Sequence, residues 1–380
     1  MAERALNLGI TCYPSVGGSG ILATALGEEL AQRGHEVHFI SYERPFRLPE
    51  NAARLHFHAV NVNDYGLFKY PDYTLPLSVK MAEVTRDFGL DVLHVHYAVP
   101  HATAAILARA MLPHDLHPRL VTTLHGTDTT LLGRDADYGP AISHALRYSD
   151  AITTVSGFLR DETQQLFAIK RPIHVIHNFF KPRAPGRSAE AVRSELGLTN
   201  EVVLFHSSNL RAPKRIDLLL ETVAQIQSPV PFKLVLLAGD SFAPFASAVR
   251  ALKIEDRLLV IERVRDVEDY LQIADLGLFT SESESFCLSI LEAMCFACPS
   301  VARRVGGIPE VVENGKTGAL VASDDPAQLA REVEELLNDP ARRQAMGRAA
   351  QERAQRQFSA AAIVPQYEAL YRGVLENGGI

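Results

Sequence analysis

The chain of 380 residues has no tryptophan, few cysteines and no excess of basic side chains. Its formal net charge of −7 argues against broad nucleic-acid binding, which needs a basic surface. No apolar run reaches the roughly 20 residues of a membrane-spanning helix. The first residues, Met-Ala-Glu-Arg, lack the apolar core of a signal peptide. We therefore expect a cytoplasmic protein that binds neither nucleic acid nor membranes.

The four cysteines do not suggest a disulfide framework, and three of them crowd into one segment: Cys287, Cys295 and Cys298. The last two have the spacing of a redox or zinc motif. A zinc site would need two more soft or imidazole ligands nearby, and the flanking sequence offers none. Cysteine at the end of an apolar helix packs as a small hydrophobe. We therefore expect buried structural cysteines in a reducing compartment, and no metal site.

Apolar runs that read as strands alternate with helical stretches along the whole chain, which predicts an α/β fold with parallel sheets. The expected strands of the first half are 7–11, 37–41, 56–60, 92–96, 120–123, 151–155 and 173–176. Those of the second half are 202–206, 232–238, 258–261, 276–280 and 300–303. The expected helices are 21–33, 75–88, 102–111, 139–148, 157–167, 215–227, 242–251, 267–274, 288–296, 308–313 and 326–338.

The length of the chain favours two domains rather than one core. The segment 181–186, Lys-Pro-Arg-Ala-Pro-Gly, is too rich in proline and glycine for a helix or strand interior. We expect one domain over residues 1–180 and a second domain over 181–360. A helix over 361–380 is expected to pack back toward the first domain.

Two carboxylates, Glu284 and Glu292, lie eight residues apart where an expected strand and turn lead into a helix. Positions eight apart lie about 80° apart around a helix, on roughly the same side. The helix N-terminus offers unpaired N–H groups that suit a phosphate, and the carboxylates suit neutral hydroxyls. Glutamates at this spacing also occur on solvated helix faces. The two segments that follow, Gly306-Gly-Ile-Pro-Glu310 and Asn314-Gly-Lys-Thr-Gly318, lie at the distance found in the retaining glycosyltransferases that this pattern resembles, which favours a nucleotide-sugar site.

Three cations, Arg211, Lys214 and Arg215, follow the strand 202–206 within five residues. Such a cluster can grip a diphosphate, although a solvated basic turn would look the same. The glutamates on a neighbouring strand end favour the diphosphate.

The glycines after the first strand admit a second interpretation. Gly18, Gly20 and Ala23 fit the dinucleotide fingerprint Gly-x-Gly-x-x-Gly/Ala, but the loop is longer than that motif and contains an extra proline and glycine. Nicotinamide binding is therefore disfavoured. The loop N–H groups suit an anion, either a phosphate or the carboxylate of an acceptor.

Histidines close two further strands. His94 and His96 share a strand face without an acidic partner at ligand spacing, so a core position is the better interpretation for His94. His125 ends a strand just before a glycine, and we expect it to face the cleft.

These motifs together resemble the donor domain of glycosyltransferase family 4, and the resemblance covers nearly the whole chain. Four segments, 9–20, 45–48, 94–101 and 122–128, are similar to members of that family that act in bacillithiol biosynthesis. The resemblance implies two facing Rossmann-like domains (the GT-B architecture) with the active site in the cleft between them. The domain over 1–180 would bind the acceptor and the domain over 181–360 the nucleotide-sugar donor. It also implies transfer of N-acetylglucosamine from UDP-N-acetylglucosamine to the hydroxyl of L-malate, with retention at the anomeric carbon and no metal or other cofactor.

The resemblance further implies roles for individual residues. The catalytic residues would be His125, Arg211, Lys214 and Glu284. The donor site would add Gly18, Asn209, Phe286, Cys287, Leu288 and Glu292. The acceptor site would contain Ser19, Arg47, Tyr97 and Thr123.

This sequence departs from the family pattern at two positions. Asn209 stands where the wider family often has an arginine, so Arg211 would supply that charge. Cys287 replaces the usual glycine. Two alternatives stay open: a family member with another small or lipid acceptor, and a non-catalytic protein that binds nucleotide sugars. The sequence also leaves open whether the chain forms a homo-oligomer.

Overall fold

The computed structural model describes residues 4–14, 18–50, 52–62 and 72–376. The chain divides into two compact units. The first combines Met1–Asn178 with Ala360–Ile380, and the second is Phe179–Ser359. Each unit is built on its own parallel sheet with helices as crossover connections, so the predicted α/β fold class is confirmed.

In the described part of the first unit, seven parallel strands form a sheet in the order β3-β2-β1-β4-β5-β6-β7. The strands are β1 Asn7–Thr11, β2 Glu36–Ser41, β3 Leu55–Ala59, β4 Val92–His96, β5 Arg119–Leu124, β6 Ala151–Thr154 and β7 Ile173–Val175. The helices are α1 Gly18–Gln32, α2 Thr74–Phe88, α3 Thr103–Ala110, α4 Thr127–Thr130, α5 Gly139–Tyr148, α6 Gly157–Phe167 and α15 Ala360–Glu376. Single turns are η1 Ala98–Ala102, η2 His114–Leu116 and η3 Leu132–Arg134.

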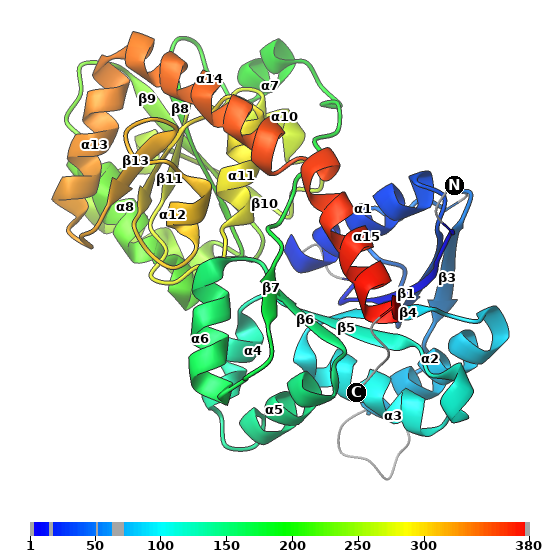
Figure 1. The fold of residues 1–380 in the computed structure, drawn as a ribbon. Coiled ribbons are helices and arrows are strands. Elements are labelled where there is room, and N and C mark those ends of the chain that lie inside the picture. The colour runs from blue at the N-terminus through cyan, green and yellow to red at the C-terminus, as the bar shows by residue number, and fades with distance from the viewer. Residues whose placement is uncertain (1–3, 15–17, 51, 63–71, 377–380) are drawn as a thin grey trace. The chain divides into compact units, whose positions relative to one another are not determined.

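Helix α15 comes from the far end of the chain yet belongs to the first unit, where it lies beside α1 (Figure 1). Two of its tyrosines, Tyr367 and Tyr371, are fully buried. The Tyr371 hydroxyl is 2.7 Å from His94 Nδ1 on β4. A second polar contact joins His35 Nε2 to the Glu368 carboxylate at 3.0 Å. The first unit is therefore completed by a helix that follows the second unit in sequence.

In the second unit the sheet order is β10-β9-β8-β11-β12-β13, again parallel. The strands are β8 Val202–Ser208, β9 Phe232–Ala238, β10 Leu258–Glu262, β11 Leu276–Phe279, β12 Ser300–Arg303 and β13 Gly318–Val321. The helices are α7 Ala189–Glu195, α8 Ile216–Gln225, α9 Ala246–Leu252, α10 Glu268–Leu271, α11 Leu288–Cys295, α12 Ile308–Val311, α13 Pro326–Asn338 and α14 Pro340–Gln357. Single turns are η4 Ala212–Lys214, η5 Ala243–Phe245 and η6 Glu255–Arg257.

The central strands of the second sheet are apolar, as expected for parallel strands covered on both faces, whereas β4 and β5 of the first sheet also bury His94, His96, Thr122 and Thr123. In the second unit Leu204, Leu236 and Leu278, on β8, β9 and β11, are fully buried in one core cluster. Burial of each such side chain stabilises the unit by about 1.5–3 kcal/mol.

Both sheets reverse their strand order next to their first strand. β1 lies between β2 and β4, and β8 lies between β9 and β11. In open parallel sheets this reversal leaves a crevice at the carboxyl ends of the strands, where ligands bind. The crevice beside β1 is bordered by the residues after β1 and β4, and that beside β8 by the residues after β8 and β11.

Every strand expected from the sequence is present, with ends shifted by at most two residues. Strand β13 and helices α4 and α7 were not predicted. The tail over 343–375 was expected to be helical, and it contains two helices, since α14 ends at Gln357 and α15 begins at Ala360.

All four cysteines are free, and Cys12, Cys287 and Cys298 are buried. Among the described residues, no group of three or more His, Cys, Asp or Glu side chains is arranged to hold a metal ion. In the same part of the chain, no helix has the length and apolar character to cross a bilayer.

Candidate active site

In the second unit, Lys214 and Glu284 form a largely buried ion pair. Lys214 ends the turn η4 after β8, and Glu284 lies in the turn after β11, so the strand reversal brings them together. Lys214 Nζ lies 2.5 Å from Glu284 Oε1, and the Ser281 hydroxyl donates to the same oxygen at 2.8 Å. The side chains are 25% and 10% exposed. A predicted cation and a predicted carboxylate thus share one crevice.

Backbone contacts hold the two loops of this crevice against each other. The Glu282 N–H donates to the Pro213 carbonyl at 2.7 Å. The Thr280 hydroxyl donates to the carbonyl of Arg215 at 3.0 Å. These bonds fix the separation of the lysine and the glutamate before any ligand arrives.

Two glycines before α12, Gly306 and Gly307, allow their segment to approach the turn that contains Glu284. The Gly307 N–H donates to the Glu284 carbonyl at 2.9 Å. Gly306 has φ +54°, and a Cβ added there would lie 1.9 Å from the Glu284 carbonyl oxygen. Only glycine fits this approach. The motif at 306–310 therefore supports the turn that carries Glu284.

Electrostatics keep Lys214 charged. Its partial burial lowers the pKa, but the attraction of Glu284 and the hydrogen bond between them outweigh burial, so the net pKa is raised. The ammonium group is therefore present at neutral pH and can face a phosphate.

Helix α11 begins directly after this turn. Cys287 is its N-cap residue, with φ 71° in the left-handed region, and burial raises the pKa of its thiol, with Glu284 adding to the effect. Phe286 is 2% exposed and packs edge-on against Phe358. Leu288 is the first helical residue, and Glu292 lies one turn further on, 8% exposed. The predicted donor residues 286–292 thus surround one helix N-terminus.

Asn209 and Arg211 are exposed residues between β8 and η4. The Arg211 N–H donates to Asn209 Oδ1 at 3.4 Å. Repulsion from Arg211 opposes the raised pKa of Lys214, but Glu284 outweighs it.

In the first unit, the crevice beside β1 contains Tyr97 and Ser19. Tyr97 follows β4 and has φ 82°, an uncommon conformation for a bulky residue. Its hydroxyl donates to Ser19 Oγ on α1 at 2.8 Å, and its N–H donates to the Thr123 carbonyl at 2.9 Å. Gly18, which starts α1, is exposed. The structure thus brings Gly18, Ser19, Tyr97 and the backbone of Thr123 together.

The Thr123 side chain points into the protein. It is fully buried, and its hydroxyl lies 2.6 Å from both His94 Nε2 and Thr153 Oγ1. These partners occupy the hydroxyl, which argues against a direct acceptor contact by this side chain. His94, bonded to Thr123 and Tyr371, is the core residue that the sequence predicted.

His125 lies beside this cluster, with its ring 5.2 Å from that of Tyr97. Burial lowers its pKa to about 3, so the imidazole is neutral at physiological pH. Its Nε2 is 2.8 Å from His96 Nδ1.

Arg47 lies in the turn after β2, with φ 70° and its guanidinium over the Phe46 ring at 5.7 Å.

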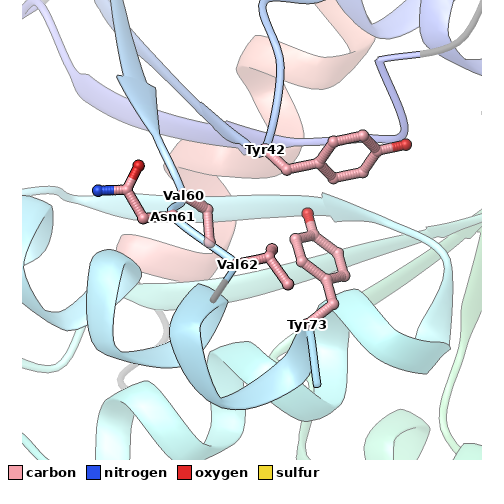
Figure 2. Close-up of a pocket in the computed structure, with 5 residues that line it drawn as sticks. All are labelled: Tyr42, Val60, Asn61, Val62 and Tyr73. Carbon is pink, nitrogen blue, oxygen red and sulfur yellow. The ribbon is translucent and has the colours of Figure 1, made fainter. Parts of the chain in front are cut away.

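The carboxyl ends of β2 and β3 border a pocket of about 670 Å³. Figure 2 shows its lining residues, Tyr42, Val60, Asn61, Val62 and Tyr73. The Tyr42 and Tyr73 rings meet edge to face at 5.2 Å. None of the predicted acceptor residues lines this pocket.

Sequence reasoning missed Asp128, which is fully buried at the start of α4. Its Oδ1 accepts the Ala98 N–H at 3.0 Å, so it ties the segment after β5 to the segment after β4. Burial raises its pKa to about 7, although backbone N–H groups favour the ionised form. The signal available in the sequence was the aspartate three residues after His125.

Two family models match the chain. The model described as Glycosyltransferase Family 4 matches residues 16–184, and the model described as Glycosyl transferases group 1 matches residues 188–353.

A full-length relative is N-acetyl-alpha-D-glucosaminyl L-malate synthase of Bacillus anthracis, 43% identical over 98% of both chains. D-inositol 3-phosphate glycosyltransferase 1 of Catenulispora acidiphila is 27% identical over 76% of this chain and 73% of its own. Among solved structures, Anabaena HepE in complex with UDP-glucose matches with a TM-score of 0.79 and 19% identity, over 97% of this chain and 100% of that one.

The structural match shows the fold, and its full coverage of both chains fits the two-unit GT-B architecture expected from the sequence. Family membership follows from the two models, which together span both units, and from the full-length relative. This chain belongs to glycosyltransferase family 4.

Proposed function

We propose that this glycosyltransferase moves N-acetylglucosamine from UDP-N-acetylglucosamine to the hydroxyl of L-malate, with retention at the anomeric carbon, the first step of bacillithiol biosynthesis. The observation that carries the proposal is the similarity to the malate synthase of Bacillus anthracis, at 43% identity over 98% of both chains. The UDP-glucose bound in HepE, which shares the fold, supports a UDP-sugar donor.

The donor site is the crevice beside β8. Lys214 and Arg211 neutralise the diphosphate, and N–H groups at the start of α11, from Phe286 to Leu288, add hydrogen bonds. Negative charge grows on the departing phosphate during transfer, and preorganised cations and N–H groups stabilise that charge. The Lys214–Glu284 bond of 2.5 Å supports this assignment because it fixes the lysine beside α11.

The carboxylates of the donor site bind hydroxyls. Glu284 holds hydroxyls of the transferred sugar, Glu292 holds the ribose, and Asn209 and Gly18 complete the contacts. His125 is neutral and donates to a sugar hydroxyl near the reaction centre.

The acceptor site is formed by Ser19, Tyr97 and Arg47. Malate presents two carboxylates and one hydroxyl, so its site needs hydroxyl donors and a cation. Tyr97 and Ser19 are already bonded to each other at 2.8 Å. Thr123 contributes by holding the Tyr97 backbone through its carbonyl.

Transfer proceeds on the front face of the sugar, and the donor phosphate accepts the proton of the attacking hydroxyl. The cations Lys214 and Arg211 supply the charge that stabilises the leaving group, so we propose that no metal or other cofactor is required. The free cysteines support a reducing, cytoplasmic location.

The test is incubation of the purified chain with UDP-N-acetylglucosamine and a panel of acceptors, followed by mass spectrometry of the products. The panel contains L-malate, D-malate, succinate, which lacks the hydroxyl, and inositol 3-phosphate. The expected product is the N-acetylglucosaminide of L-malate, formed equally with and without EDTA, and its anomeric configuration is read by NMR. Transfer to inositol 3-phosphate alone would overturn the malate assignment, and UDP-sugar binding without transfer would indicate a binding protein.

A further inference from the structure

His96 and His125 form a direct imidazole pair in the first unit. In the β4–β5 register His96 lies opposite Thr123, two residues before His125. His96 Nδ1 and His125 Nε2 are 2.8 Å apart, and the two rings deviate from a common orientation by only 18°. The distance of 2.8 Å between the two nitrogens is that of an N–H···N hydrogen bond.

Such a bond holds one proton between two neutral rings. Burial lowers the pKa of His125 to about 3 and that of His96 well below its ordinary value of 6.5. A neutral imidazole carries one N–H and one lone pair, so each ring has two tautomers. Either His96 donates through Nδ1, or His125 donates through Nε2.

The second nitrogen of His96 distinguishes these two assignments. His96 is fully buried, and its Nε2 has no hydrogen-bond partner among the described residues. If His125 donated, His96 would carry its proton on Nε2, leaving a buried N–H without an acceptor. Buried donors without partners are rarer in proteins than under-satisfied acceptors. Donation by His96 Nδ1 leaves only a bare lone pair there.

A neighbouring histidine follows the same rule. His101 Nδ1 lies 2.5 Å from the His96 backbone carbonyl, which can only accept, so His101 carries its proton on Nδ1. Its Nε2 is also buried and has no partner in the described part of the chain. Burial keeps His101 neutral, with a pKa of about 4, so this nitrogen is a bare lone pair as well.

We propose that His96 is a positioning residue that donates its Nδ1–H to His125 Nε2 and thereby fixes His125 in the tautomer with a proton on Nδ1. His125 is partly exposed, and its Nδ1 has no protein partner among the described residues. Its N–H is therefore a preset donor for a hydroxyl of the sugar. This last step rests on the proposed function, whereas the tautomer does not.

The tautomer is measured directly by long-range ¹H–¹⁵N NMR on the full chain labelled with ¹⁵N-histidine. The His125 signals are assigned by their loss in His125→Gln. The expected result is a protonated Nδ1 and an unprotonated Nε2 in the unsubstituted chain. A protonated Nε2 would overturn the proposal, and this readout holds even if the chain transfers a different sugar.

Two variants then test the role of His96. His96→Leu removes the donor at similar size, and we expect His125 to lose its single tautomer and kcat/KM to fall roughly 10- to 100-fold, as for groups that orient a metal-ligating histidine. His96→Asn returns an amide donor near the Nδ1 position and should recover part of that loss. A His96→Leu chain that keeps both the Nδ1–H tautomer and normal kcat/KM would contradict the proposal.

Discussion

At the residue scale, the decisive contacts join positions that are distant in sequence. The Glu-x7-Glu spacing and the cations after β8 predicted a common site, and Lys214 and Glu284 do meet at 2.5 Å. The sequence did not reveal that Thr123 directs its hydroxyl inward, because alternation along a strand depends on which face the next helix covers. It also did not reveal Asp128, whose importance comes from burial.

Lys214→Ala should lower kcat by about 100- to 1,000-fold, since loss of one preorganised donor to a developing anion costs roughly 2.7–4 kcal/mol. The fold should persist, because Ser281 still binds Glu284. Steady-state kinetics and thermal unfolding measure the two effects. Lys316→Ala removes an exposed lysine paired with Glu313 and serves as the control with unchanged kcat. Near-normal turnover by a folded Lys214→Ala protein would show that Lys214 is not a catalytic residue.

At position 287, the glycine variant should be more stable than the alanine variant, which reverses the order usual in helices. Its φ of 71° costs a residue with a Cβ about 1–2 kcal/mol, whereas glycine adopts this conformation freely. Cys287→Gly should therefore be more stable than Cys287→Ala by about 1 kcal/mol in urea unfolding. At the helical position Ser289, the alanine variant should be the more stable one. The usual order at both positions would show that Cys287 is unstrained.

Asp128 should make stability depend on pH. Its folded pKa of about 7 lies above the ordinary value of 3.8, so its contribution is fully present below about pH 4 and is lost as the pH rises to about 7. The lost contribution is ~4 kcal/mol at 1.36 kcal/mol per pKa unit. Asp128→Asn keeps an oxygen acceptor for the Ala98 N–H but does not titrate.

Urea unfolding of both proteins across this pH range gives the comparison. The free energy of unfolding of the wild-type chain, relative to that of Asp128→Asn, should fall between about pH 4 and pH 7. Above about pH 7 the difference between the two proteins should stay constant. Parallel curves would mean that the aspartate is already ionised at low pH.

At the element scale, nearly all strands could be predicted because buried parallel strands are short apolar runs between helices. β13 was missed because its four residues, Gly318–Val321, closely follow a turn motif that reads as a loop. The order of the strands depends on contacts between distant segments that no local pattern encodes.

The docking of α15 depends on a polar contact as well as on apolar burial. Tyr371→Phe should destabilise the chain by about 1–3 kcal/mol, because His94 Nδ1 stays buried without its partner. Chemical denaturation measures this loss. Tyr148→Phe, at a tyrosine 57% exposed, should stay within about 0.5 kcal/mol of the wild type. Equal stability of the two variants would show that the hydroxyl of Tyr371 contributes nothing.

At the scale of the whole molecule, the two units differ in how the chain builds them. The second unit is one continuous segment, Phe179–Ser359, and it carries the ion pair and the α11 N-terminus. The first unit needs two separate segments. The sequence analysis predicted a boundary near residue 180 from proline and glycine content, and it also expected the tail helix to pack back toward the first domain.

Residues 179–359 expressed alone should fold and bind UDP within roughly one order of magnitude of the full chain, a difference of about 1.4 kcal/mol. Circular dichroism and calorimetry measure folding and binding. The same fragment carrying Lys214→Ala should bind UDP more weakly. A folded fragment that does not bind UDP would show that groups outside this unit are required.

The late return of α15 has a consequence for biosynthesis. A ribosome releases the chain from its N-terminus, at about 5–20 residues per second, so β4 and β5 emerge long before the helix that covers them. Until Tyr371 leaves the exit tunnel, His94 lacks one of its two hydrogen-bond partners and the sheet face beneath α15 stays uncovered. The nascent second unit, already continuous, can fold in that interval. Helix α15 is translated after the whole of the second unit, so a chain truncated before residue 360 would leave the first unit, and not the second, unfinished.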